Sequence, residues 1–530
     1  MTNVDQAELA PDSTSPEAGK AEASASRGRS RADSLVPAVP TLVAAVLCSY
    51  GLGARSLGFD EGASVTIAAQ HGTALGRAIA HDGGNMSGYY LLLHGITALF
   101  GNGLVLARLP SVVFVAAAAG LLTRLAQTLF GSRVALISGL FTAVSLPLVF
   151  WGQSARGYAP MVALTCASYL AFVALVSRAE QGRRTTPAAI AYAIATGLAA
   201  YTSFVSVLIV PAQLLMLVRR RRALAPVLRA LTFSVLSWIP LVVLALSRGS
   251  GQLFWVPRPS LKIERQVLET LTSAGLDPSF HRNAATWALL ALTTPTLLAI
   301  AAAFAVQARR GRAKWSHGLM LSWLLVPVVL AWVESLFGQP IFIPRNLLLV
   351  LPPVGVLLAL VVTDRHLPRL AGISLLAGLL ALRLIQVTAS YGVSPEDWKG
   401  ASAYVLARSN SSDCVAFYPS DGRMAFGYHL ADARTAPRPI LPPAPWSTVE
   451  PYVEDYASLA PAQLAGLPSR CPRLWLISSH EGQADGPSGS RANRRRYLRL
   501  VRDLTKLYPR RRTVRFGYAS PVRVELFKRR

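Results

Sequence analysis

Carboxylates stand out in this sequence because they lie in short polar segments between long apolar runs. Asp60 and Glu61 form an adjacent pair in the segment FDEGAS, and Asp82 follows in HDGGNMSGYY. A carboxylate beside a binding groove can take a proton from an attacking hydroxyl, so all three are candidates for general base catalysis. They could equally be solvated loop acids or ion-pair partners of Arg55 and Arg77, and the sequence leaves both interpretations open.

Two arginines are the basic counterparts of these acids. Arg156 in GQSARGY and Arg345 in FIPRN each lie at the end of an apolar run. A planar guanidinium is suited to holding a phosphate, although anchoring in lipid headgroups is the alternative. Four neighbours in the same polar segments are candidate substrate-binding residues, with an interfacial aromatic belt as the alternative for the tyrosines. These neighbours are His81, Tyr89, Gln153 and Tyr158.

The composition indicates a membrane protein. Of 530 residues, 52% are hydrophobic and 15% are charged, and the mean hydropathy is +0.39. Soluble domains carry about 25% charged residues, whereas here apolar runs reach roughly 20 residues, the length that crosses a bilayer. The net charge of +26 lies largely in short basic clusters between these runs, as in cytoplasmic loops. Nucleic acid is therefore not expected as a partner.

The apolar runs predict a polytopic α-helical fold with about eleven transmembrane helices in residues 36–388. Residues 1–35 lack a long apolar run and are expected to be a disordered cytoplasmic tail. The apolar part of 89–100 is short for a span and favours a re-entrant segment. If 89–100 does not cross, the later basic clusters all fall on the cytoplasmic side. A large first outer loop and the segments of Arg156 and Arg345 then share the opposite side.

Residues 389–530 contain no further span and predict a small extracytoplasmic α/β domain. Ser394 followed by Pro395 resembles the start of a helix, with serine as the N-cap. Segments 413–419, 473–478 and 522–527 predict strands, and a basic helix is expected near 488–507. Cys414 and Cys471 lie at the edges of predicted strands, and an oxidising compartment could join them. Sequence gives no distance between them, so the pairing stays open.

The order of the motifs resembles the C-type (GT-C) superfamily of membrane glycosyltransferases. The similarity covers most of residues 40–420 and is greatest to the branch of bacterial mannosyltransferases, protein O-mannosyltransferases and aminoarabinose transferases. The motifs that carry it are FDEGAS, the Tyr-Tyr-rich half-helix after Asp82, ARLPS, WGQSARGYA, QPIFIPRN and DWKGASAYV.

The resemblance implies a sugar transfer at the outer face of a bacterial plasma membrane. Enzymes of this type move a mannose- or arabinose-like sugar from a polyprenyl-phosphate carrier to an acceptor hydroxyl of a cell-envelope glycan, lipid or protein, here with inversion expected. Asp60, with Glu61 beside it, matches the first-loop catalytic acid, and Asp82 matches the second acid. Arg156 and Arg345 match basic positions near the donor phosphate. No cofactor is required by the pattern, and a divalent cation on the three acids stays open.

Two other classes of protein fit a chain with many spans. A transporter or flippase of lipid-linked sugars often shows internal symmetry and ionisable residues inside its spans. Here the notable charges gather at one face, which favours a surface enzyme. A non-catalytic cell-envelope scaffold is the second alternative, and it would tolerate substitution of Asp60.

Overall fold

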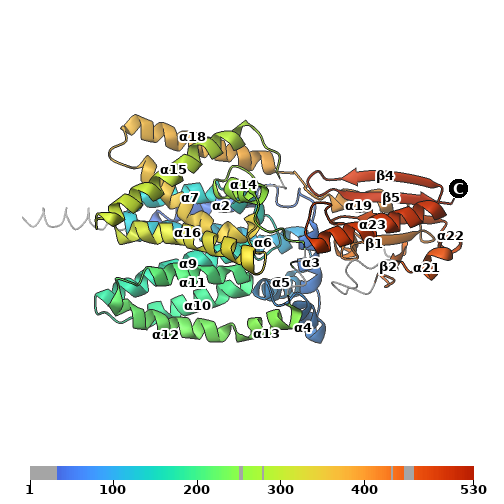
Figure 1. Ribbon diagram of the computed structural model, residues 1–530, viewed down its shortest axis with the longest axis horizontal. Coiled ribbons are helices and arrows are strands. Elements are labelled where there is room, and N and C mark those ends of the chain that lie inside the picture. The colour runs from blue at the N-terminus through green and yellow to red at the C-terminus, as the bar shows by residue number, and fades with distance from the viewer. Residues whose placement is uncertain are drawn as a thin grey trace, which may run out of the picture.

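The computed structural model shows a helical part and a sheet domain at opposite ends of the molecule (Figure 1). Helix α3 (Phe59–Ala68) lies between them. The predicted tail 1–35 falls almost entirely outside the described residues. The structure describes residues 33–249, 253, 255–276, 280–430, 434–446 and 459–529.

The helical part confirms a membrane protein. Among the described residues, six helices are long and apolar enough to cross a membrane, or up to eight if each of two bent pairs is one span. Eleven crossings remain a prediction. The six are α6 (Leu104–Phe130), α9 (Tyr158–Glu180), α15 (Ala284–Arg309), α16 (Trp315–Phe337), η3 with α17 (Pro344–Val350 and Leu351–Val362) and α18 (Arg369–Ser390).

The two bent pairs have the same local cause. Helices α7 (Ser132–Ala143) and α8 (Leu146–Gly152) meet at 59°, and α12 (Arg221–Ser237) and α13 (Ile239–Arg248) meet at 44°. The second helix of each pair has a proline in its first turn, Pro147 or Pro240. Proline lacks the N–H that would continue the hydrogen bonds of the preceding helix, so the chain bends there.

Shorter helices complete this part. Helix α5 (Ser87–Phe100) has 14 residues, a length of about 21 Å at 1.5 Å per residue, and is not among the candidate spans. This length agrees with the re-entrant segment expected there. The other helices are α2 (Ala38–Ser49), α4 (Gly72–His81), α10 (Thr186–Thr202), η1 (Phe204–Leu208), α11 (Ile209–Leu215) and α14 (Leu261–Leu271).

The C-terminal domain is a five-stranded mixed sheet in the order β2-β1-β3-β5-β4. Strand β1 is parallel to β2 and β3, and β5 is antiparallel to β3 and β4. The predicted strands and basic helix are confirmed as β1, β3, β5 and α23, while β2 and the arginine-rich β4 were not predicted. The strands are β1 (Cys414–Tyr418), β2 (Arg438–Leu441), β3 (Arg473–Ser478), β4 (Arg510–Phe516) and β5 (Val522–Lys528).

Helices cover both faces of this sheet. Helix α23 (Ser488–Leu507) packs its apolar side on one face, and α19 (Trp398–Leu406) lies against β4 and β5 on the other. The remaining helices of the domain are α20 (Gly422–Tyr428), α21 (Pro461–Ala465) and α22 (Leu467–Arg470).

Helix α19 begins later than the sequence predicts. Asp397 is the N-cap, because its Oδ1 accepts a hydrogen bond from the Gly400 N–H at 2.9 Å. The expected N-cap Ser394 is therefore wrong. Its hydroxyl instead accepts from the Ser56 N–H at 2.9 Å, so this side chain joins the C-terminal domain to the first loop.

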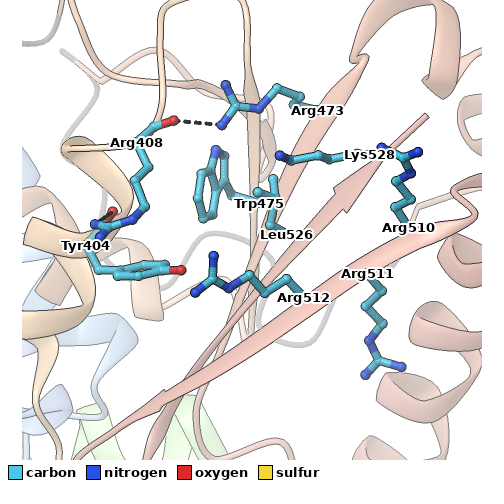
Figure 2. A pocket seen from close by; sticks show the side chains of 9 residues that line it. All are labelled: Tyr404, Arg408, Arg473, Trp475, Arg510, Arg511, Arg512, Leu526 and Lys528. Atoms are coloured by element: carbon cyan, nitrogen blue, oxygen red, sulfur yellow. Dashed lines mark hydrogen bonds between the residues drawn. The ribbon is translucent and has the colours of Figure 1, made fainter. Parts of the chain in front are cut away.

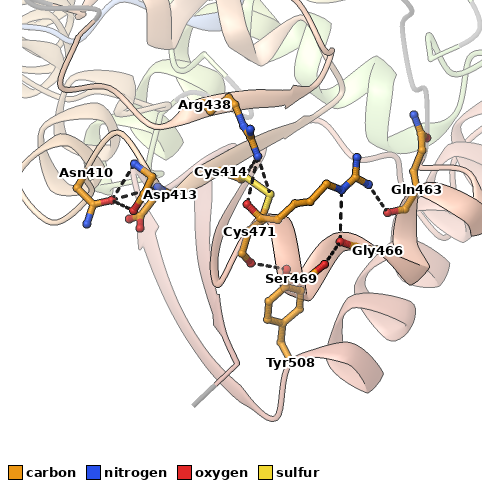
Figure 3. The surroundings of a disulfide bond; sticks show 11 residues. Asn410, Asp413, Cys414, Arg438, Gln463, Gly466, Ser469, Cys471 and Tyr508 are labelled. Atoms are coloured by element: carbon orange, nitrogen blue, oxygen red, sulfur yellow. Dashed lines mark hydrogen bonds between the residues drawn. A yellow bond between two sulfur atoms is a disulfide. The ribbon is translucent and has the colours of Figure 1, made fainter.

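Cys414 and Cys471 form a disulfide, which answers the question that the sequence left open. The bond joins the start of β1 to the segment before β3, two neighbouring parallel strands. Figure 3 shows the Arg438 guanidinium against the two sulfurs and the Tyr508 hydroxyl donating to the Cys471 carbonyl at 2.7 Å. The disulfide thus links β1 covalently to the segment before β3 at one end of the sheet.

Loss of this disulfide should destabilise the C-terminal domain selectively. The bond closes a loop with a sequence separation of 57, for which the chain-entropy model gives about 4 kcal/mol. We expect Cys414→Ser/Cys471→Ser protein in membranes to lose this domain to trypsin faster than wild type, while the helical part stays resistant. Equal cleavage rates at matched expression would show that the bond contributes no stability.

Candidate active site

A buried ion pair holds the first loop on the helical part. Glu61 in the first turn of α3 accepts from Arg108 of α6 through both oxygens, at 2.9 Å to Nε and 2.8 Å to Nη2. Both side chains are almost completely enclosed, with 7% and 0% exposed. Glu61 also accepts from the Ala155 N–H at 2.8 Å, and Arg108 donates to the carbonyls of Leu52, Arg55 and Ser56. The second acid of FDEGAS is therefore used in positioning the loop.

Gln153 strengthens the same attachment. Its amide donates to the Tyr50 carbonyl at 2.7 Å and to the Cys48 carbonyl at 3.2 Å, joining the end of α8 to the end of α2. Arg55, which could have paired with the acids, donates instead to the Gln153 carbonyl at 2.8 Å and lies over the Phe150 ring. These contacts fix the loop before α3 against the turn that carries Arg156.

Asp60 is the centre of a cluster of charges at the start of α3. Its Oδ2 lies 2.7 Å from Arg345 Nη1 and 3.9 Å from Arg156 Nη2. Arg156 Nη1 is also 3.2 Å from the Asp60 carbonyl oxygen and from Ser64 Oγ. The side chain of Asp60 remains 41% exposed, and no described residue donates a hydrogen bond to its Oδ1. The structure therefore brings together one acid and two arginines that are distant in sequence.

This cluster sets the protonation of Asp60. Desolvation by the surrounding protein would raise the pKa of its carboxyl group, but attraction to Arg156, Arg345 and then His480 outweighs that effect. The pKa falls to about 2, so Asp60 is ionised throughout the physiological range.

The C-terminal domain contributes two further residues that the sequence analysis missed. His480 follows β3 with a left-handed backbone, φ +57°, which is uncommon for a residue other than glycine. Its Nε2 lies 3.2 Å from Glu396 Oε1, and Glu396 Oε2 accepts from the Phe59 N–H at 2.7 Å. The His480 ring also packs on the Phe59 ring at 4.8 Å between centroids. Only the position of Glu396 beside the DWKG motif could have signalled its role.

Close backbone packing brings this domain to α3. A Cβ atom on Gly62 would lie 3.0 Å from the backbone of Ala425 in α20. Since real Cβ atoms rarely approach a backbone so closely, glycine lets the two helices meet. The C-terminal domain therefore rests directly on the helix that carries Asp60.

Asp82 is bonded to a tyrosine of α5. Its Oδ2 accepts from the Tyr90 hydroxyl at 2.8 Å. Burial raises the pKa of Tyr90, and the charge of Asp82 raises it further. His81 lies 3.4 Å from Arg248 of α13 and makes no described contact with Asp60.

The tyrosines of the predicted site are largely buried. The Tyr89 hydroxyl lies 3.3 Å from Ser111 Oγ and from the Ala107 carbonyl, so it packs α5 on α6. The Tyr158 ring meets Trp151 edge-to-face at 4.6 Å, and the Arg156 guanidinium lies 5.9 Å from its centre. Tyr158 thus lies beside Arg156, and Tyr89 is linked to the same turn through Ser111, whose hydroxyl donates to the Ser154 carbonyl.

The described residues of the candidate site do not form a ligand set for a divalent cation. Within the described ranges, no group of three or more His, Cys, Asp or Glu side chains is arranged to hold a metal ion. Glu61 is occupied by Arg108, and Asp82 bonds to Tyr90. We therefore assign no step to a metal.

The arrangement of a helical membrane part, a large first loop and a small sheet domain is similar to that of solved membrane transferases. Residues 88–247 match the family model of the dolichyl-phosphate-mannose-protein mannosyltransferases. Comparison with curated proteins by sequence gave no match. The resemblance found in the sequence is thus confirmed by a family model over part of the chain and by the fold over most of it.

Solved structures show how far the fold is shared. The apo structure of ArnT from Cupriavidus metallidurans aligns with a TM-score of 0.52 at 14% identity, covering 92% of this chain and 97% of that one. The same protein bound to undecaprenyl phosphate gives 0.51 at 13% identity with the same coverage. The oligosaccharyltransferase AglB from Archaeoglobus fulgidus, in complex with an inhibitory peptide and a dolichol-phosphate, gives 0.51 at 12% identity, covering 86% and 70%.

Breaking the Glu61–Arg108 pair should destabilise the whole membrane part. Removing one partner of a buried ion pair leaves the other charge uncompensated and costs about 3–5 kcal/mol. We expect Glu61→Gln and Arg108→Met each to lower the melting temperature of the detergent-solubilised protein sharply. Arg124→Met, at an exposed position near the other end of α6, should change it little. The double variant should lose less than the sum of the two single losses, and strict additivity would contradict the pairing.

The contact between His480 and Glu396 should make the protein pH-sensitive. Burial alone would lower the pKa of His480, but Glu396, Asp60 and Glu481 together raise it. A raised folded-state pKa adds stability that is fully present below the unfolded value of about 6.5 and is lost as pH rises through the folded value.

We therefore expect the melting-temperature difference between wild type and His480→Gln to be largest at acidic pH and to shrink as pH rises. The exposed His366→Gln substitution serves as the control and should leave the pH profile unchanged. A constant difference between wild type and His480→Gln across pH would mean that the charge of His480 does not stabilise the fold.

Proposed function

We propose that this protein transfers a sugar from a polyprenyl-phosphate carrier to an acceptor hydroxyl, with Asp60 as the general base. One observation carries the proposal. Asp60 Oδ2 faces the two arginines, whereas Oδ1 accepts no hydrogen bond from the described residues. The two arginines beside Oδ2 can thus hold a phosphate, while Oδ1 is available to accept a proton from an acceptor hydroxyl. The family model supports a sugar transferase, and the fold relatives bound to polyprenyl phosphates support the donor class.

The charge balance of the cluster suits an anionic donor. Asp60 carries one negative charge, and Arg156 and Arg345 carry two positive charges, so an arriving phosphate meets a net positive cluster. The phosphate competes with Asp60 for the guanidinium groups. As these groups turn to the phosphate, the pKa of Asp60 rises from its low resting value, which makes the carboxylate a better base once the donor is bound.

The reaction follows as a single displacement. The acceptor oxygen attacks the anomeric carbon while its proton passes to Asp60, and the bond from that carbon to the phosphate oxygen breaks. The electron pair of that bond leaves with the polyprenyl phosphate, whose growing negative charge is stabilised by Arg156 and Arg345. Attack opposite the leaving group inverts the anomeric configuration.

The remaining predicted site residues receive different roles. We assign Glu61 to positioning α3, since both of its oxygens are bound by Arg108. Asp82 with Tyr90 forms a second polar edge near Asp60 that can bind sugar hydroxyls. Gln153, Tyr89 and Tyr158 hold the arginine turn, and His81 lies outside the reacting centre.

The membrane placement belongs to the same proposal. The site lies between the helical part and the C-terminal domain, on the side that the charge bias assigns to the outside of a bacterial plasma membrane. The sugar is mannose- or arabinose-like, and the acceptor is a cell-envelope glycan, lipid or protein. A flippase is less well supported, because the charged cluster gathers at one face, beside α3, with Arg345 at the very start of its candidate span and Asp60 and Arg156 outside the candidate spans.

The test is transfer of radiolabelled sugar from polyprenyl-phosphate mannose and polyprenyl-phosphate aminoarabinose to endogenous acceptors in membranes. Loss of a general base typically costs a factor of about 10² to 10⁴ in rate, so we expect Asp60→Asn to fall at least a hundredfold. Arg345→Gln should lose activity and bind donor more weakly. Asp364→Asn makes the same carboxylate-to-amide change in the exposed loop between α17 and α18 and should keep full activity.

The outcomes separate the alternatives. Transfer that survives in Asp60→Asn at matched expression would remove Asp60 as the base. Transfer with neither donor in wild type, together with donor movement across the bilayer, would favour the flippase.

A further inference from the structure

A second cationic site lies in the C-terminal domain, at the end of the sheet far from the helical part (Figure 1). It is a pocket of about 380 Å³ between β3, β4, β5 and the end of α19. Of the nine residues that line it, six are arginine or lysine and none is acidic. The lining residues are Tyr404, Arg408, Arg473, Trp475, Arg510, Arg511, Arg512, Leu526 and Lys528.

The register of the strands lines up like charges. Lys528 of β5 stands opposite Arg473 of β3 on one side and opposite Arg510 of β4 on the other. Arg512 occupies the next position on the same face, opposite Leu526. Like charges directly opposite one another in neighbouring strands destabilise a sheet. An anion bound over this row of cations would offset their mutual repulsion.

Acidic side chains neutralise only part of this charge. Asp413 lies 3.5 Å from Arg473, and Glu525 pairs with Arg511 on the opposite face. Within the described part of the chain, the other four cations have no carboxylate within ion-pair distance; they are Arg408, Arg510, Arg512 and Lys528. The positive charge of these four residues would be balanced best by a ligand with more than one negative charge.

A buried donor points to the same conclusion. The Nε atom of Arg473 is buried and has no hydrogen-bond partner among the described residues, although its Nη2 donates to the Arg408 carbonyl at 2.7 Å. An unsatisfied buried donor is costly.

The strand that begins at this arginine ends two residues before His480, so the pocket and the candidate active site occupy opposite ends of β3.

We propose that this pocket binds a phosphate monoester. A phosphate dianion matches the uncompensated charge better than a single carboxylate does, and guanidinium groups bind phosphate through paired hydrogen bonds. The volume lies within the range of roughly 300–1,000 Å³ typical of small-molecule sites and exceeds what phosphate alone needs. The pocket lies at the start of β3, at the opposite end of that strand from His480 and the candidate active site, so we expect a water-soluble ligand. The proposal does not depend on the sugar-transfer reaction.

The test is isothermal titration calorimetry on the full chain in detergent and phosphate-free buffer, with glucose 6-phosphate, inorganic phosphate and acetate as probes. We expect both phosphates to bind and acetate to bind at least tenfold more weakly. Arg512→Gln and Lys528→Gln should each weaken phosphate binding about tenfold or more, the effect of losing one charge-assisted hydrogen bond. Glucose 6-phosphate binding more tightly than inorganic phosphate would support the monoester, and the reverse order would overturn it.

Two further variants make the result specific. Arg515→Gln removes the same charge from the other face of β4 and should bind as wild type does. Arg345→Gln should also retain binding, which separates this pocket from the candidate active site. Equal losses in Arg515→Gln and Arg512→Gln, binding abolished by Arg345→Gln, acetate binding as tight as phosphate, or no phosphate binding in wild type would each overturn the proposal.

Discussion

The ion pair between Glu61 and Arg108 is the constraint on which the candidate site depends. A charged pair withdrawn from water is tolerated only when its hydrogen-bonding groups are satisfied. Here the carboxylate receives two bonds from the guanidinium and one from the Ala155 N–H, and Arg108 fills its remaining donors with carbonyls of the first loop. These bonds fix the first turn of α3 and the turn that carries Arg156 against each other. Asp60, one residue before Glu61, is thereby presented to both arginines.

The C-terminal domain is part of this arrangement. Glu396 accepts from the Phe59 N–H, and Gly62 lets α20 approach α3 at backbone distance. His480 reaches the same helix from the end of β3 and helps to lower the pKa of Asp60. Because these contacts come from one domain, its position sets both the access to Asp60 and the charge around it.

The molecule has two cationic sites of different construction. At the candidate active site the arginines come from different elements and surround a carboxylate, so an anionic donor can exchange with an internal partner. In the pocket of the sheet domain, the cations are aligned by strand register, with few acids nearby. The first construction suits a ligand that must bind and leave during a reaction, and the second suits a ligand that is retained.

The sequence by itself determined the membrane class, the order of the elements and the residue types of the chemistry. Apolar length and charge bias act locally along the chain, as do the short apolar runs that predicted β1 and β3 and the alternating pattern that predicted β5. The tertiary structure decided which acid faces the site. Asp60 and Glu61 are adjacent and chemically alike, and only the approach of Arg108 from α6 buries one and leaves the other 41% exposed. Glu396 and His480 both contact Phe59, which lies hundreds of positions earlier in the chain. Such contacts leave no periodic signal in the sequence, because they depend on how two folded domains pack together.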